Sequence, residues 1–192
     1  VFSLRSRNSF GVGEFTDIRL LVDWARNTGL KLIQLLPIND TMTSNTWMDS
    51  YPYSAISAFA LHPLYINLSK VAGKEYSDPL KSLKKKQAEL NELAEVDYVE
   101  VMKYKYAVLK ELYDVMGEEC LVSDGFKKFF KENRHWLEPF SAFCFFRDKY
   151  GTAEFSTWKT NAIYAKDEIA KLCSPKSAVY KNIGFYFFNQ YH

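Results

Sequence analysis

Apolar residues at the start of the chain follow first a strand-like and then a helical pattern. Residues 1–4 form a short apolar run that predicts a strand. Apolar residues then recur every three or four positions, which predicts a helix that Thr16 caps and Gly29 ends. Residues 30–38 form a nearly continuous apolar run, as parallel strands do when both of their faces are buried. Together these segments predict a right-handed strand–helix–strand unit.

Helical spacing of apolar residues dominates the chain from Pro79 onward. The clearest apolar stripe has spacings of four, three, four and three, and we expect it to end at Gly117: Met102, Tyr106, Leu109, Tyr113 and Met116. Ser123 is expected to cap the next helix. Further helices are predicted over 136–150, with Pro139 in the first turn and Gly151 at the end, over 158–173, and over 178–192.

This change of pattern divides the chain into two parts. We expect residues 1–68 to form the first strands, a helix and a long loop, and residues 69–192 to form a mainly helical insertion. The predicted fold class is α/β, with helix as the main content. The spacing alone leaves two architectures open, an α/β barrel or a layered sheet, either of which would carry the insertion.

Composition favours a folded domain and gives no argument for a nucleic-acid or membrane partner. Hydrophobic residues make up 47% of the 192 residues, and the formal net charge is only +2. No apolar run approaches the length of a membrane span. The three cysteines lack CxxC spacing, which favours reduced thiols in a cytoplasmic protein. The three histidines lack a metal-binding spacing, so we expect neither a metal nor a cofactor.

One loop carries most of the candidate chemistry. Residues 49–68, DSYPYSAISAFALHPLYINL, contain three tyrosines and no lysine or arginine, whereas connecting loops are usually small and polar. The loop follows the second predicted strand, and in α/β barrels the loops at the carboxyl ends of the strands build the active site. Residues 5–15 form the loop after the first predicted strand, and we expect them at the same face.

The residue types in this region suit a carbohydrate ligand. Aromatic rings pack on the C–H faces of sugars, while Asp, Asn and Ser bind hydroxyl groups. The candidates are Asn39, Asp40, Trp47, Asp49, Ser50, Tyr51, Tyr53 and Ser54. Structural alternatives stay open, because the tyrosines can pack the insertion onto the rest of the fold and the aspartates can cap turns. Gly11 and Gly13 form a GxG that lacks the third glycine of a dinucleotide fingerprint, so we set a nucleotide site aside.

Two long motifs resemble a known family. They are SFGVGEFTDIRLLVDWA with GLKLIQLLPINDT, and DSYPYSAISAFALHPLYINL. The chain resembles the start of the catalytic domain of 4-α-glucanotransferases, the amylomaltases or disproportionating enzymes of the α-amylase-like barrel clan. Support comes from two later stretches, FKKFFKENRHWLEPFSAFCFFRDKYG and FYFFNQYH. The nearest branch is the longer one, typified by the plant cytosolic disproportionating enzyme, where WWDSYPYS replaces the shorter GDSPYQS.

The resemblance implies a fold, an activity and a mechanism. The fold is the start of a (β/α)8 barrel, about two strands, with a long helical insertion. The activity is transfer of glucosyl or maltosyl units between α-1,4-glucans, so the expected partner is a maltooligosaccharide or α-glucan. The family uses a retaining mechanism with an Asp nucleophile, a Glu acid/base and a further Asp. All three match beyond His192, so we assign no catalytic residue here and expect the isolated chain to be inactive.

The same resemblance implies substrate-binding roles for residues of the loop and of the segment just before it. Six residues are assigned: Asp40, Trp47, Asp49, Ser50, Tyr51 and Tyr53. Tyr53 matches a tyrosine that packs beside the sugar next to the scissile bond, and Asp49 and Ser50 match an Asp-Ser pair expected to contact glucan hydroxyls. Trp47 stands where shorter members have an aromatic residue of a secondary glucan site. Tyr51 is inserted relative to those members.

Two other functions stay open as alternatives. The first is a hydrolytic α-glucosidase-like barrel, which would release only glucose and maltose from maltooligosaccharides. The second is a non-catalytic glucan-binding or helical interaction module, which would fold alone as a monomer. A fragment of a barrel would instead expose strand edges and an unfinished core, so we expect the isolated chain to self-associate.

Overall fold

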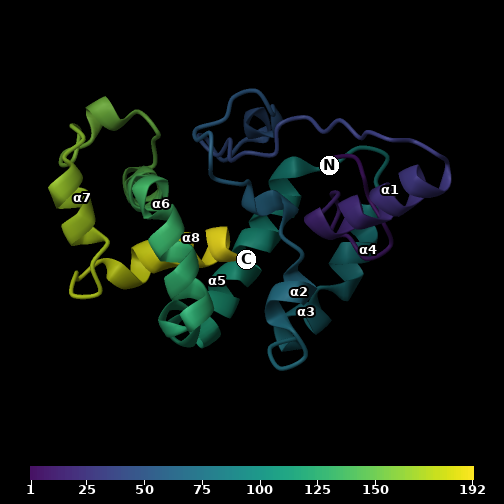
Figure 1. Cartoon of the computed structure of the whole chain (residues 1–192). Helices are drawn as coiled ribbons and strands as arrows, with labels where there is room; N and C mark the ends of the chain where they lie inside the picture. Colours follow the sequence, from purple (N-terminus) through teal and green to yellow (C-terminus); the bar gives the residue numbers. More distant parts are fainter.

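The chain folds into helices joined by long irregular segments (Figure 1). The computed structural model describes residues 1–192 apart from the side chain of Pro79. The α-helices are α1 (Phe15–Asn27), α2 (Leu68–Ala72), α3 (Asp78–Ser82), α4 (Lys84–Glu92), α5 (Tyr98–Val122), α6 (Asp124–Tyr150), α7 (Lys166–Leu172) and α8 (Tyr180–Tyr191). Short 3-10 helices lie at η1 (Trp47–Ser50), η2 (Pro63–Tyr65) and η3 (Phe155–Thr157). The predicted predominance of helix is confirmed.

The two predicted strands are not formed by the described residues. Residues 1–4 make a tight turn in which the N–H of Leu4 donates to the carbonyl of Val1 at 2.7 Å. Residues 30–37 have no strand partner in the described chain, and 81% of the surface of Leu32 is exposed. A parallel strand needs hydrogen-bonding neighbours along its edges, whereas the described chain pairs only the last residue of this segment, Ile38, with His62, beside an antiparallel bridge.

Helix α1 is confirmed, although it begins differently from the prediction. Its N-cap is Glu14 rather than Thr16. Asp17 accepts a hydrogen bond from the N–H of Glu14 at 2.7 Å and so closes the first turn. Gly29 follows the helix with φ of +81°, in the left-handed region that glycine adopts without strain. The predicted glycine stop is therefore confirmed.

Helix α5 does not end at Gly117 as predicted but continues to Val122. Instead, Gly117 leaves room for the ring of Tyr113, because a Cβ at this position would lie 2.4 Å from that ring. The helix ends at Ser123, whose Oγ accepts a hydrogen bond from the N–H of Phe126 at 3.1 Å. Ser123 therefore caps α6, as predicted.

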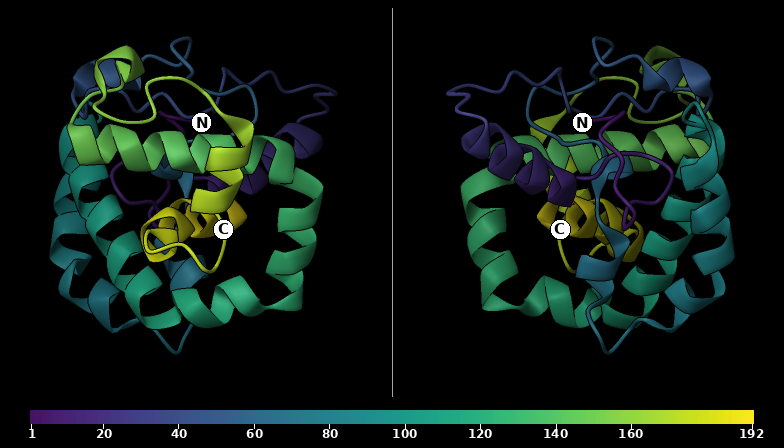
Figure 2. Two further views of the ribbon diagram at one scale, coloured as in Figure 1. Left: turned by 90° about the vertical axis from the view of Figure 1, so that its left-hand side faces the viewer. Right: turned by 90° about the vertical axis from the view of Figure 1, so that its right-hand side faces the viewer.

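Helix α6 is one helix of 27 residues, in which Pro139 lies in the interior rather than in the first turn. Proline has no N–H, so α6 lacks one internal hydrogen bond there. Figure 2 shows the two halves of α6 at a clear angle to each other. Gly151 ends the helix with φ of +68°, as predicted. The prediction over 158–173 was too long, because only α7 is helical there.

Helix α8 lies inside the frame that α5 and α6 form, as both views of Figure 2 show. Its buried residues Ile183, Phe187 and Phe188 belong to the larger apolar cluster, together with residues of α2, α5, α6 and α7. A smaller cluster joins Phe10 and Val12 to the start of α5. Both clusters contain residues from each side of Leu68. No described helix combines the length and the apolar character that crossing a bilayer requires.

Candidate functional site

Residues 39–62, here called the aromatic loop, leave the main body of the chain and return to the same place. An antiparallel bridge joins Asn39 to Leu61 at the base. The N–H of Asp40 donates to the carbonyl of Ala60 at 2.9 Å, and the N–H of His62 donates to the carbonyl of Ile38 at 3.0 Å. The two ends of the loop are therefore paired like adjacent strands, although no longer ladder extends from them among the described residues.

Four aromatic side chains of the loop are exposed, of which Phe59 stacks on Trp136 of α6 and the other three, between residues 47 and 53, do not stack on a helical side chain among the residues that the structure describes. The exposed fractions are 72% for Trp47, 58% for Tyr51 and 62% for Tyr53. The rings of Tyr51 and Tyr53 lie 5.5 Å apart at an angle of 55°. In the described chain these rings are open to solvent rather than packed between helices, so their faces are accessible to a ligand.

The carboxylate of Asp49 points inward and organises the loop. Only 2% of this residue is exposed. It accepts hydrogen bonds from the hydroxyl of Thr43 at 2.8 Å, from the N–H of Asn45 at 2.7 Å and from both the N–H and the hydroxyl of Ser44. The hydroxyl of Thr41 also donates to the carbonyl of Asp49. These donors fix residues 41–49 as a compact turn, which holds η1 and its tryptophan in place.

Asp40 is buried under the loop beside a buried arginine. Its Oδ1 accepts a hydrogen bond from the N–H of Met42 at 2.9 Å. Burial raises the pKa of Asp40 to about 6, although the nearby guanidinium of Arg147 opposes the shift. Arg147 in turn donates to the carbonyl of Met42 at 2.7 Å and to Asp148 at 2.8 Å. The entrance to the loop is thus bonded to the last turns of α6.

His62 closes the other end of the loop as a neutral side chain. Its Nδ1 accepts a hydrogen bond from the N–H of Leu64 at 3.1 Å, which leaves Nε2 as the protonated ring nitrogen. Nε2 lies 3.1 Å from the hydroxyl of Tyr98 on α5. Burial lowers the pKa of His62 to about 3.

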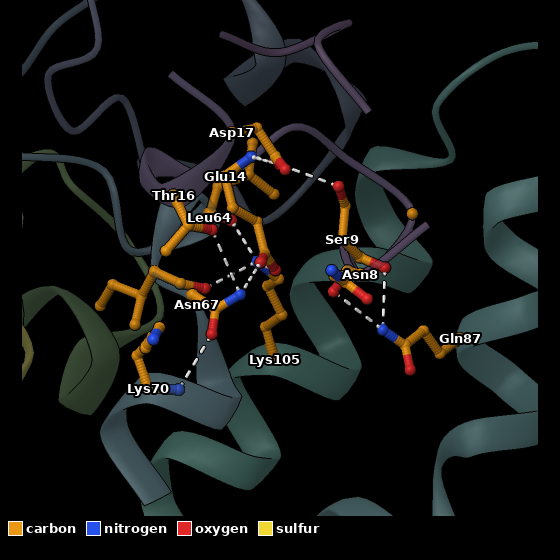
Figure 3. A network of polar contacts seen from close by, with 12 residues as sticks. Asn8, Ser9, Glu14, Thr16, Asp17, Leu64, Asn67, Lys70, Gln87 and Lys105 are labelled. Atoms are coloured by element: carbon orange, nitrogen blue, oxygen red, sulfur yellow. Dashed lines mark hydrogen bonds and ion pairs between the residues drawn. The ribbon is translucent and has the colours of Figure 1, made fainter. Parts of the chain in front are cut away.

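A buried ion pair connects the first loop to α5 (Figure 3). Lys105 is fully buried and donates to Glu14 at 2.6 Å, to the carbonyl of Leu64 at 2.7 Å and to that of Ile66 at 2.8 Å. Asn67 donates to the other oxygen of Glu14. Burial raises the pKa of Glu14 and lowers that of Lys105, while each charge favours the ionised form of the other.

Sequence reasoning missed this pair, although the chain carries a signal for it. Lys105 lies three to four positions from Val101 and Val108 and so occupies the buried face of α5. A lone lysine on an apolar helix face is rarely buried without an acidic partner. That signal identifies Lys105 but not Glu14, because the partner lies 91 residues away.

A cavity of about 480 Å³ lies between the aromatic loop, the first loop and the start of α5. Its lining includes Arg5, Trp47, Ser50 and Tyr98, so the structure brings the two loops together at one face. Tyr51 and Tyr53 are not among its lining residues and lie on the outer surface of the loop. Among the described residues, no group of three or more His, Cys, Asp or Glu side chains is placed to hold a metal ion.

Comparisons with known proteins agree along the whole chain. A family model described as 4-alpha-glucanotransferase matches residues 1–192. The chain is 40% identical over 192 residues to 4-alpha-glucanotransferase DPE2 of Oryza sativa subsp. japonica, covering all of this chain and 20% of the rice protein. It is 30% identical over 192 residues to the 4-alpha-glucanotransferase of Chlamydia muridarum, covering all of this chain and 35% of that protein. The chain therefore spans about a fifth to a third of the length of these relatives.

Proposed function

We propose that this chain, which belongs to the 4-alpha-glucanotransferase family, is the N-terminal part of the catalytic domain of such an enzyme. The protein that carries it transfers glucosyl or maltosyl units from one α-1,4-glucan to another. The match of the whole chain to the family supports this proposal, as does the small share of each relative that the chain covers. The unpaired state of the three cysteines supports the cytoplasm as the compartment.

The proposed reaction is a retaining double displacement. Retention requires two carboxyl groups about 5 Å apart, one as nucleophile and one as acid and then base. Neither role is assigned within residues 1–192, because the family's catalytic acids match beyond this region. The chain alone is therefore proposed to be inactive, and its contribution is to bind and orient glucan.

We further propose that residues 30–38 form a barrel strand when the rest of the catalytic domain supplies its neighbours. The unpaired course of residues 30–37 and the exposure of Leu32 and Leu36 support the proposal. In this view residues 1–68 belong to the barrel and residues 69–192 form the insertion.

The observation that carries the proposed binding role is a group of exposed rings on a loop whose backbone is held by hydrogen bonds to buried side chains. Trp47, Tyr51 and Tyr53 present ring faces on which sugars stack, and the hydroxyl of Ser50 lies beside the cavity. Asp40 and Asp49 belong to the proposed site as well. Their carboxylates are buried, so their contribution is to hold the loop open toward the glucan.

The proposed function is tested with the full-length protein and maltose as the substrate. Disproportionation predicts glucose together with maltotriose and longer chains, separated by chromatography. Glucose alone would identify a hydrolase on the same framework. The absence of any reaction with maltose or longer maltooligosaccharides would reject enzymatic function and leave a glucan-binding module. Transfer by the isolated 192-residue chain would contradict the proposal that the chain is only part of the catalytic domain.

A further inference from the structure

A side chain from the far end of the sequence forms hydrogen bonds with the base of the aromatic loop. Gln190 of α8 accepts a hydrogen bond from the N–H of Leu61 at 2.9 Å and donates one to the carbonyl of Leu61 at 2.8 Å. The hydrogen bonds of the bridge between Asn39 and Leu61 are made by the residues on either side of Leu61, namely Ala60 and His62. In such an antiparallel pair, the N–H and carbonyl of Leu61 itself point away from Asn39. One glutamine therefore pairs with Leu61 as the next strand of a sheet would.

A second contact comes from α6 and reaches the other end of the loop, near its start. Arg147 donates to the carbonyl of Met42 at 2.7 Å across 105 residues of sequence. Its guanidinium is oriented by Asp148, which also accepts a hydrogen bond from the hydroxyl of Tyr186 on α8 at 2.8 Å. Both contacts to the loop thus come from α6 and α8, which pack against each other in the larger apolar cluster.

We propose that Gln190 and Arg147 are positioning residues, through which α6 and α8 set the place and angle of the aromatic loop for glucan binding. This inference rests on the proposed function. The hydrogen bonds that the two side chains make to the loop go to its backbone, at Leu61 and Met42, so we infer that they act through the loop rather than on the substrate. The helical part of the chain then takes part in substrate binding without contributing a ring to the site.

The chemistry of the two contacts determines which variants are informative. Gln190 is only partly buried and makes neutral hydrogen bonds, so its removal leaves the core of α8 intact. Gln190→Glu keeps the size of the side chain but replaces the amide donor by an oxygen that faces the carbonyl of Leu61. Arg147 is buried among charges, and its removal threatens folding. Gln190 therefore carries the test.

The experiment compares the full-length wild-type protein with Gln190→Ala, Gln190→Glu and the control Asn182→Ala, an exposed amide on the same helix. The measured quantities are kcat and KM for maltotriose, the melting temperature, and the rate of amide hydrogen exchange in residues 39–62. A loop displaced by about 1 Å can cost up to a hundredfold in efficiency. We expect KM to rise about tenfold in both Gln190 variants, with kcat within about twofold of wild type and loop exchange faster.

Each outcome decides the question. Wild-type KM and wild-type loop exchange in Gln190→Ala would overturn the inference. A fall in kcat and melting temperature at unchanged KM would also overturn it, because that is the result of a purely structural role. If the wild-type protein shows no transfer, the proposed function fails, but amide hydrogen exchange still tests whether Gln190 holds the loop. Faster exchange confined to residues 39–62 in the Gln190 variants, but not in Asn182→Ala, supports it.

Discussion

Tyr53 and Asp49 lie in the same loop, but their surroundings give them different tasks. The ring of Tyr53 is largely exposed, whereas the carboxylate of Asp49 is buried and accepts hydrogen bonds from three neighbouring residues. An exposed ring contributes little to stability, while a buried acceptor is costly to remove because its donors lose their partner. Substitutions at exposed and at buried positions of the loop should therefore separate effects on ligand binding from effects on stability.

Replacing Tyr53 by alanine in the full-length protein should lower the rate of transfer about a hundredfold. A ring contact that strengthens in the transition state is worth about 2–3 kcal/mol. The melting temperature should stay nearly unchanged because the side chain is exposed. Tyr53→Phe is the matched control, since it keeps the ring and removes only the hydroxyl. A collapse of stability in Tyr53→Ala would mean that the residue packs against a part of the protein outside this chain.

His62 should make the folded protein sensitive to acid. Its pKa is about 3 in the folded state and 6.5 in the unfolded state, so the unfolded chain takes up a proton first as the pH falls. Stability attributable to His62 is complete above pH 6.5 and decreases by about 2 kcal/mol between pH 7 and pH 5. The raised pKa of Asp40 has the opposite sign, so the comparison must be between variants that share Asp40.

Thermal denaturation of His62→Gln and wild-type protein across this pH range measures the effect. The variant should be less stable at pH 7 but should lose less stability on acidification. Tyr98→Phe removes the hydroxyl that contacts the ring and keeps the titrating group, so its pH dependence should follow that of wild type. Parallel curves for His62→Gln and wild type would show that His62 does not titrate as proposed.

At the scale of elements, three helix boundaries were predictable from local signals, whereas the cap of α1 was misplaced at Thr16 instead of Glu14. Ser123, Gly29 and Gly151 act through backbone groups within a few residues, and each does what the sequence predicted. Gly117 and Pro139 were misjudged because α5 and α6 continue through them, and both helices pack with α8 in the larger apolar cluster. Local preference is worth about 1 kcal/mol for a glycine, which tertiary contacts readily exceed.

Gly117→Ala should therefore destabilise the protein, contrary to the gain of about 1 kcal/mol expected for this change in a helix interior. The added Cβ would overlap the ring of Tyr113, which is held by a hydrogen bond from its hydroxyl to the carbonyl of Lys181 at 2.7 Å. Overpacking of this kind costs about 1–3 kcal/mol. Chemical denaturation of Gly117→Ala beside Glu118→Ala, an exposed neighbour, provides the measurement. A more stable Gly117→Ala would show that the Tyr113 ring moves freely.

At the scale of the whole molecule, part of the apolar surface has no cover within the described chain. Leu20 and Trp24 on α1 are more than half exposed, as are Leu32 and Leu36 in the following segment. Figure 1 shows α1 at one edge of the molecule, away from the α5, α6 and α8 core. Isolated exposed apolar residues are ordinary, but several on consecutive segments favour association.

The isolated 192-residue chain should consequently self-associate at micromolar concentrations. Leu32→Lys combined with Leu36→Lys should shift it toward the monomer, because charges on the exposed segment oppose burial. Val115→Lys is the control, since Val115 is 63% exposed on α5 and lies outside that segment. Sedimentation velocity measures the distribution of species. A monomeric wild-type chain with a sharp melting transition would contradict this view of an incomplete domain.

The candidate site could be predicted only in part from the sequence, because some of its contacts depend on the packing of the whole molecule. The loop and its aromatic residues could be located because they are contiguous along the chain. The contacts of Gln190 and Arg147 could not, since they join residues 129 and 105 positions apart and depend on how α6 and α8 pack. The strand predicted over 30–38 rested on neighbours that the described chain does not provide, so its formation stays a proposal.

The paired base of the aromatic loop leaves its tip free to vary in length. Once the ends are held at Asn39 and Leu61, the entropy of loop closure grows only with the logarithm of the number of residues between them. Even a doubling of the loop adds only about 0.6 kcal/mol. An extra residue, as the family resemblance implies for Tyr51, therefore adds little free energy, and the reach of the loop over a ligand can change while its anchorage stays the same.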